Sequence, residues 1–244
     1  SLGIEKYTHD FFICYAALTY ASCLERLKEI KQKPNFIFIY GSICDKKKLN
    51  IVFQKYKIDT VINFTAETYV DRNIQFFKIF LETNIKGTYS LSELSKNMLF
   101  LDLQISTDEI YEDLGLTDLP FTEESGSQNN SATKAAADMF IMSYMRTYQL
   151  PCSILRCSNN YGPYKILKEF ISMVIINALH NKAIPTVERI KDTKLDNVLD
   201  HRIAVDLIVR NGKAGKVYNI SGKEVITNLD LSKEILRTLG KKEY

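Results

Sequence analysis

Short apolar runs alternate along this chain with longer stretches of helical periodicity, and this alternation limits the folds open to it. The apolar runs are rich in Ile, Val, Leu and Phe, as strands covered on both faces should be. We predict strands over residues 36–39, 60–64, 101–105 and 152–156, and helices over residues 80–96, 133–148, 166–180 and 229–239. Strands that alternate with helices at this spacing predict an α/β protein with a doubly wound parallel sheet.

Composition excludes several classes of function. With 32 Lys and Arg against 29 Asp and Glu, the net charge of +3 argues against a protein that coats nucleic acid. No apolar stretch approaches the ~20 residues that span a bilayer, and the first apolar cluster is interrupted at Tyr15, unlike a signal peptide. We therefore expect a cytoplasmic protein with neither a nucleic-acid partner nor a membrane partner.

The five cysteines and three histidines are scattered, and no two cysteines form a Cys-x-x-Cys pair. Zinc sites need paired thiolates or Cys and His at short spacing, so we expect no metal site. Free thiols in a reducing compartment are the better interpretation of the cysteines.

The strongest local motif is Ile105-Ser-Thr-Asp-Glu-Ile-Tyr111, directly after a predicted strand. Adjacent carboxylates in different surroundings can hold different pKa values, so one can act as an acid and the other as a base. A capped turn that merely ends a strand is the structural alternative. Active sites of α/β proteins are built at the carboxyl ends of strands, which favours the catalytic interpretation.

Three further polar clusters follow predicted strands or begin a helix. Lys134 stands near a helix start, where the helix dipole disfavours a cation, so a functional lysine is favoured over a solvated one. The clusters are Asn63–Asp71, Ser131–Lys134 and Arg156–Pro163. Their convergence on one edge of one sheet indicates a site there.

Together these motifs resemble the nucleotide-sugar dehydratases of the extended short-chain dehydrogenase type. The resemblance rests on Asn63–Arg72, Ser106–Glu109, Ser131–Asp138 and Arg156–Pro163, and it extends from Ala17–Tyr20 to Thr238–Gly240 through Gly212–Ile220 and Thr227–Asp230. The Ser-Thr-Asp-Glu block favours a dehydratase over an epimerase, and the match is closest to enzymes that act on dTDP-glucose. The resemblance implies a Rossmann-like NAD-binding domain over residues 1–162. It also implies a mainly substrate-binding portion over residues 163–244, parts of which can return to the sheet.

The family's chemistry, carried onto this sequence, implies NAD-dependent internal redox and elimination of water from a nucleotide-sugar substrate. Glu109 would remove the proton from the sugar C5, and Asp108 would protonate the leaving C6 hydroxyl. Thr107 would hydrogen-bond the C4 oxygen, and Lys134 would bind the nicotinamide ribose. The other residues implied for the cofactor are Ile43, Phe64, Thr65, Ala66, Thr68, Thr83 and Asn160, and those implied for the substrate are Thr68, Thr107, Asn159 and Asn228.

The sequence also departs from the family pattern. The tyrosine of the Tyr-x-x-x-Lys pair would stand four residues before Lys134, where the sequence has Asn130. Ala16 and Ser42 replace acidic residues, and no Gly-rich loop occurs. A first residue of Ser1 rather than Met fits a start inside a longer protein or a short added remnant. Two explanations compete: a degraded relative, or a sequence from which segments are absent.

Three interpretations of function therefore stay open at this point. The first is a dehydratase, the second is an epimerase or decarboxylase of the same fold, and the third is a non-catalytic relative that binds a nucleotide sugar or a partner chain. The resemblance also implies a homodimer in which the helices over residues 80–96 and 133–148 pair with their copies. Their apolar stripes could equally face the core.

Overall fold

The computed structural model describes residues 2–19, 22, 24–67, 77–111, 121–123, 125, 132–163, 170–184, 192–222 and 225–241. The chain divides into two compact units. The first contains Ser1–Arg156 and Val205–Asn219, and the second contains Cys157–Ala204 and Ile220–Tyr244. The predicted division of roles, with cofactor binding in residues 1–162 and substrate binding in 163–244, stays a prediction.

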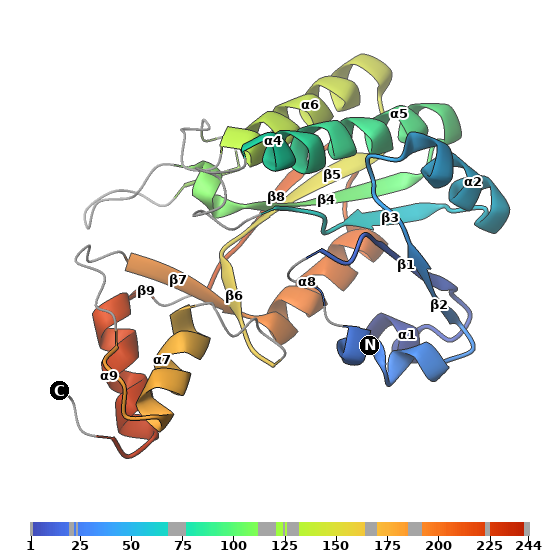
Figure 1. Cartoon of the computed structure of the whole chain (residues 1–244). Helices are drawn as coiled ribbons and strands as arrows, with labels where there is room; N and C mark the ends of the chain where they lie inside the picture. The colour runs from blue at the N-terminus through green and yellow to red at the C-terminus, as the bar shows by residue number, and fades with distance from the viewer. Residues whose placement is uncertain are drawn as a thin grey trace. The chain divides into compact units, whose positions relative to one another are not determined.

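Parallel strands with helices packed along them form the first unit, so the predicted α/β class is confirmed (Figure 1). One sheet pairs β1 with β2 in parallel, and a second has the order β3-β4-β5-β8, in which β3 and β4 are parallel. The strands are β1 (Phe12–Ala16), β2 (Phe36–Tyr40), β3 (Thr60–Asn63), β4 (Leu101–Thr107), β5 (Cys152–Cys157) and β8 (Val217–Ile220). The four predicted strands are confirmed, and all six residues of β5 are buried, as expected for a central strand.

The predicted helix over residues 80–96 forms as three consecutive segments. These are α4 (Phe77–Phe80), the π-helical segment η3 (Leu81–Gly87) and α5 (Thr88–Met98). Helix α6 (Ala132–Tyr148) lies beside them along the same face of the four-stranded sheet (Figure 1). Gly87, the last residue of η3, lets the helical layer pack closely against Ile43. A Cβ at position 87 would lie only 2.4 Å from Cδ1 of Ile43.

Helix α2 (Lys46–Tyr56) starts at the run of three lysines that follows β2. Asp45 caps it, since its Oδ1 accepts a hydrogen bond from the Lys48 amide at 3.0 Å. Lys57 ends it in the left-handed conformation, with φ of 49°. The first unit also contains α1 (Leu2–Lys6) and the short 3-10 turns η1 (Leu24–Leu27), η2 (Ile30–Gln32) and η4 (Asp108–Ile110).

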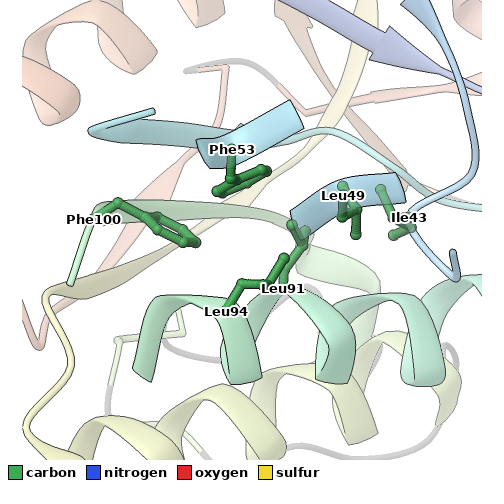
Figure 2. Close-up of a cluster of buried hydrophobic side chains, with 6 residues drawn as sticks. All are labelled: Ile43, Leu49, Phe53, Leu91, Leu94 and Phe100. Carbon is green, nitrogen blue, oxygen red and sulfur yellow. The ribbon is translucent and has the colours of Figure 1, made fainter. Parts of the chain in front are cut away.

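A hydrophobic cluster joins α2 and α5 to the sheet. Leu91 and Leu94 of α5 point toward Phe53 and Leu49 of α2, with Phe100 beside them (Figure 2). The rings of Phe53 and Phe100 lie 5.0 Å apart, in a tilted arrangement. Val61 of β3 and Tyr15 of β1 pack against the same cluster, so both helices are attached to the strands through it.

The described part of the second unit contains a sheet of order β6-β7-β9, two complete helices and the start of a third. Strand β6 (Asn159–Tyr161) pairs with β7 (Asp192–Asn197) in parallel, and β9 (Val225–Thr227) pairs with β7 antiparallel. Helix α7 (Phe170–Leu179) contacts α9 (Asn228–Thr238), and α8 (Val198–Asn211) begins in this unit and ends in the first. Thr227 caps α9 by accepting a hydrogen bond from the Asp230 amide at 3.0 Å.

Candidate active site

The Ser-Thr-Asp-Glu block lies at the carboxyl end of β4, as the sequence predicts. The strand ends at Thr107, whose Oγ1 accepts a hydrogen bond from the Glu109 amide at 3.2 Å and starts the 3-10 turn η4. Ile110 and Tyr111 anchor the turn, since their side chains are buried. Thr107 and Asp108 are half-buried and Glu109 is exposed, so the two carboxylates differ in their contact with water.

Lys134 reaches the same strand end from helix α6. Its side chain is buried, and its Nζ donates a hydrogen bond to the Ile105 carbonyl oxygen at 2.9 Å. The Gln104 Nε2 donates to the same oxygen at 3.3 Å. Helix α6 contacts both β4 and η4, so Lys134 and the Thr107–Glu109 block lie at the same end of β4.

A side-chain hydrogen bond also fixes the loop after β3. The Asn63 Nδ2 donates to the Gln104 Oε1 at 2.7 Å, and the Asn63 Oδ1 accepts from the Thr65 amide at 3.1 Å. These bonds turn the chain at Phe64, which is exposed, and leave Thr65 and Ala66 half-buried. Three of the residues implied for the cofactor therefore follow β3 at a defined turn.

Asn84 is a buried polar residue that the sequence analysis did not predict. Its Oδ1 accepts from the Glu67 amide at 2.8 Å, and its Nδ2 donates to the Glu67 carbonyl at 3.1 Å and to the Thr133 Oγ1 at 3.0 Å. It therefore joins the loop after β3 to the residue that precedes Lys134. The sequence did contain one indication of this burial. Asn84 is spaced from Phe80 and Leu91 so that all three lie on the apolar face of a helix.

Other residues implied for the site have mixed placements. Ile43 lies in the hydrophobic cluster of Figure 2, so its side chain contributes to the core. Thr83 is half-buried in η3, next to Asn84. Thr68 and Asn130 lie outside the described residues. All their implied roles stay predictions.

In the second unit, Asn159 is exposed and Asn160 is half-buried on β6. The Asn160 Nδ2 donates to the Ser158 carbonyl at 3.3 Å. Asn228 is the first residue of α9, where its carbonyl accepts a hydrogen bond from the Ser232 Oγ at 2.8 Å. The implied roles of these three asparagines in binding stay predictions.

Two kinds of feature are absent from the described part of the chain. It contains no group of three or more His, Cys, Asp and Glu side chains arranged to hold a metal ion. None of its helices combines the length and the apolar character needed to cross a membrane.

Comparison with known proteins decides the family. The sequence model of the family described as GDP-mannose 4,6 dehydratase matches residues 2–243. The dTDP-glucose 4,6-dehydratase of Haemophilus influenzae is 38% identical over 252 residues, covering 97% of this chain and 74% of that protein. That of Neisseria meningitidis is 37% identical and covers 97% of this chain and 70% of its own length. The chain belongs to the dTDP-glucose 4,6-dehydratase family.

Solved structures of dTDP-glucose 4,6-dehydratases share this fold. The Bacillus anthracis enzyme, solved in complex with NAD, matches with a TM-score of 0.91 and 35% identity over 99% of this chain and 76% of that one. DesIV from Streptomyces venezuelae, solved with NAD and TYD bound, matches with a TM-score of 0.92 and 30% identity over 99% and 75%. The predicted family and its Rossmann-like fold are confirmed.

Proposed function

We propose that this chain is a dTDP-glucose 4,6-dehydratase that converts dTDP-glucose to dTDP-4-keto-6-deoxyglucose. The observation that carries the proposal is that the Asp108 and Glu109 carboxylates and the buried Lys134 amine lie at the same end of β4. The reaction needs an acid, a base and a cation close together, and these three residues supply those groups.

The residues after β3 and β4 fit the nicotinamide ribose of NAD, which we propose as the cofactor. Lys134 offers ammonium donors to hydroxyl groups, Thr65 adds a hydroxyl, and Ala66 is small enough for close approach of a ligand. When held by Lys134 and the loop after β3, NAD would supply the hydride acceptor for the sugar C4 and the hydride donor for C6. In the family pattern an acidic residue at the position of Ala16 holds the adenine ribose of NAD. Ala16, at the end of β1, offers only a methyl group, so we expect this chain to bind NAD more weakly than a relative with the acidic residue.

The chain's own residues then divide the proton transfers. Glu109 is exposed and can take the C5 proton, which is acidic beside a C4 ketone. Asp108 is half-buried and can protonate the leaving C6 hydroxyl. Since the Thr107 Oγ1 accepts the Glu109 amide hydrogen, its own proton is available to the C4 oxygen of the sugar.

A non-catalytic relative that binds the nucleotide sugar is the second candidate, and Asn130 is the observation that favours it. An amide cannot act as the phenolate base that the family pattern places four residues before Lys134. This change affects C4 oxidation and leaves the carboxylates and Lys134 in place.

The test uses dTDP-glucose with added NAD in deuterated water. We expect a 4-keto sugar to form and deuterium to enter at C5, and we expect Glu109→Gln to abolish both. Glu234→Gln on the surface of α9 is the matched control, since the half-exposed Glu234 carboxylate accepts a hydrogen bond from Arg237, far in sequence from the residues assigned to the proton transfers. Unchanged deuterium entry in Glu109→Gln contradicts the role of Glu109. Binding without any turnover of the unaltered chain supports the non-catalytic relative.

We further propose that two copies pair through α5 and α6. Large apolar side chains on the outer faces of these helices are exposed, and a surface hollow lined by Met139 and Met142 lies on α6. The exposed side chains are Tyr89, Met139, Phe140 and Tyr148. Such a patch indicates an interface. Light scattering should give the mass of a dimer for the unaltered chain. Met139→Lys should lower the measured mass toward that of one chain, whereas Ile51→Lys, on the exposed side of α2, should leave it unchanged.

A cytoplasmic location is part of the proposal. Cys14, Cys44, Cys152 and Cys157, the cysteines within the described residues, are free thiols. Free thiols are typical of a reducing compartment, which supports this location.

A further inference from the structure

A buried ion pair lies beside the candidate site and has no part in the proposed chemistry. The Arg156 Nε on β5 lies 3.2 Å from the Asp138 Oδ2 on α6, and the two side chains are 5% and 2% exposed. Removing two charges from water is expensive, and apolar residues of similar volume often stabilise a core as well or better. A contribution to stability alone is therefore a weak account of this pair.

Arg156 makes a second contact through another of its nitrogens, to Tyr111. Its Nη1 donates to the Tyr111 Oη at 2.8 Å, and its guanidinium carbon lies 5.0 Å from the centre of the Tyr111 ring. The Tyr111 Oη donates in turn to the Asn219 Oδ1 at 3.0 Å. The Tyr111 ring stacks on Phe121 with a separation of 4.8 Å. Through these contacts Arg156 of β5 connects α6 and β8 with Tyr111, the residue that follows η4.

The two ends of this network lead to the two halves of the candidate site. Asp138 follows Lys134 by one turn of α6, and residues four apart lie on the same face of a helix. Tyr111 ends the turn that holds the two carboxylates, and its amide donates to the Asp108 carbonyl at 2.9 Å. A shift of Arg156 would therefore move Lys134 and the carboxylates relative to each other.

The charges along the network support this coupling. Burial raises the pKa of Asp138, while a hydrogen bond from Ser106 and the charges of Arg156 and Lys134 oppose that rise. Ser106 directly precedes Thr107 on β4. The Asp138 carboxylate is therefore linked to the lysine and to the strand end.

We propose that Arg156, Asp138 and Tyr111 form a positioning network that sets the separation of Lys134 from the Asp108 and Glu109 pair. The proposal rests on the proposed function, because the separation matters only if these groups act on one substrate. None of the three residues contacts substrate in this role. A misplacement of about 1 Å in a catalytic group can lower a rate about 100-fold.

Tyr111→Phe is the sharpest test, since it removes only the hydroxyl and keeps the stacked ring. We expect kcat to fall about 10- to 100-fold, with KM for dTDP-glucose and the amount of bound NAD changing less than about threefold. Amide hydrogen exchange in the segment containing Glu109 and Tyr111 should become faster. Tyr7→Phe is the matched control, because it removes a hydroxyl bonded to the Asp206 carboxylate at 2.9 Å.

Unaltered kcat and unaltered amide exchange in Tyr111→Phe would overturn the network. An equal loss of kcat in Tyr7→Phe would also overturn it, since that loss would reflect stability alone. Asn219→Ala removes the acceptor of the Tyr111 hydroxyl, so it should also lower kcat while leaving KM nearly unchanged. This variant tests the network if Tyr111→Phe folds poorly. If the unaltered chain forms no 4-keto sugar, the proposed function fails, while faster exchange around Glu109 in Tyr111→Phe still supports the network.

Discussion

The Lys134 Nζ lies 2.9 Å from the carbonyl oxygen of Ile105, two residues before Thr107. The contact holds a cation in the first turn of α6, where the helix dipole disfavours it. A main-chain carbonyl has a fixed position in the strand, so it also limits the conformations of the lysine. The amine is thereby kept at the strand end that carries the two carboxylates.

Replacing Lys134 by Met keeps most of the side-chain length and removes the charge. We expect kcat/KM for dTDP-glucose to fall at least about 100-fold, because the proposed ribose contact and its charge are lost together. Steady-state assays measure this. Lys47→Met, at an exposed lysine of α2, is the control. Activity of Lys134→Met within threefold of the unaltered chain would exclude the assigned role.

Introducing a phenol at position 130 tests the most consequential departure from the family pattern. Asn130→Tyr places a tyrosine four residues before Lys134, and general-base catalysis contributes about 100-fold or more to a rate. We expect formation of the 4-keto sugar to rise at least about 10-fold. Asn130→Phe supplies the same ring without the hydroxyl and should give no rise. Equal rates for the two variants would show that the hydroxyl plays no part.

Asn84 should contribute to stability as well as to the site. Asn84→Ala leaves the buried Glu67 amide without its Asn84 partner and removes two further hydrogen bonds, so we expect a loss of about 3 kcal/mol in the free energy of unfolding. Urea denaturation measures it. Asn97→Ala on the exposed side of α5 should change the free energy by less than about 0.5 kcal/mol. Similar losses in both variants would contradict the structural role of Asn84.

Asp102 should make stability depend on pH. It is fully buried at the start of β4, and burial raises its pKa to about 7, whereas an exposed aspartate titrates near about 3.9. Folding therefore favours the protonated form, and stability falls as the pH rises from about 4 to about 7. The nearby Cys152 thiol, 4.0 Å from the Asp102 Oδ2, stays protonated in this range, since its pKa is raised to about 12 by burial.

Asp102→Asn removes this titration. At pH 8 the variant should be more stable than the unaltered chain, by up to about 4 kcal/mol, and the difference should shrink toward pH 4. Thermal or urea unfolding across this range measures it. Asp59→Asn, at an exposed aspartate, should leave the pH profile unchanged. A constant difference between Asp102→Asn and the unaltered chain would show that Asp102 does not titrate there.

Sequence patterns predicted the central strands because buried parallel strands are short, apolar and bounded by polar residues. β5 and β4 are of this kind. β1 was not predicted, since Phe12–Ala16 is half-buried and its apolar run is broken at Tyr15. On α6, the periodicity left open whether the apolar stripe faces the core or a second copy, and Met139 and Phe140 are 60% and 42% exposed. Hydrophobicity alone does not reveal which stripe of a helix faces the sheet.

The candidate site was predictable where its residues are close in sequence or match a motif. Thr107, Asp108 and Glu109 follow one strand, and Lys134 begins one helix. The contacts of Asn84 and of Arg156 join residues 17 to 49 positions apart, so no local pattern specifies them. Contacts of this kind depend on how the elements pack, which a single sequence does not show.

The π-helical segment η3 places a constraint on the length of the chain. A π-helix holds more residues per turn than an α-helix, so shortening Leu81–Gly87 by one residue would let the helix run as a regular α-helix. The helix on either side would keep its phase, because the wide turn absorbs the extra residue. Asn84 stands at the centre of this segment, so deleting Asn84 itself would make the helix more regular and remove the link between Glu67 and Thr133. The irregular turn therefore gives the chain one additional side chain at this position, and a shorter, more regular helix would lack it.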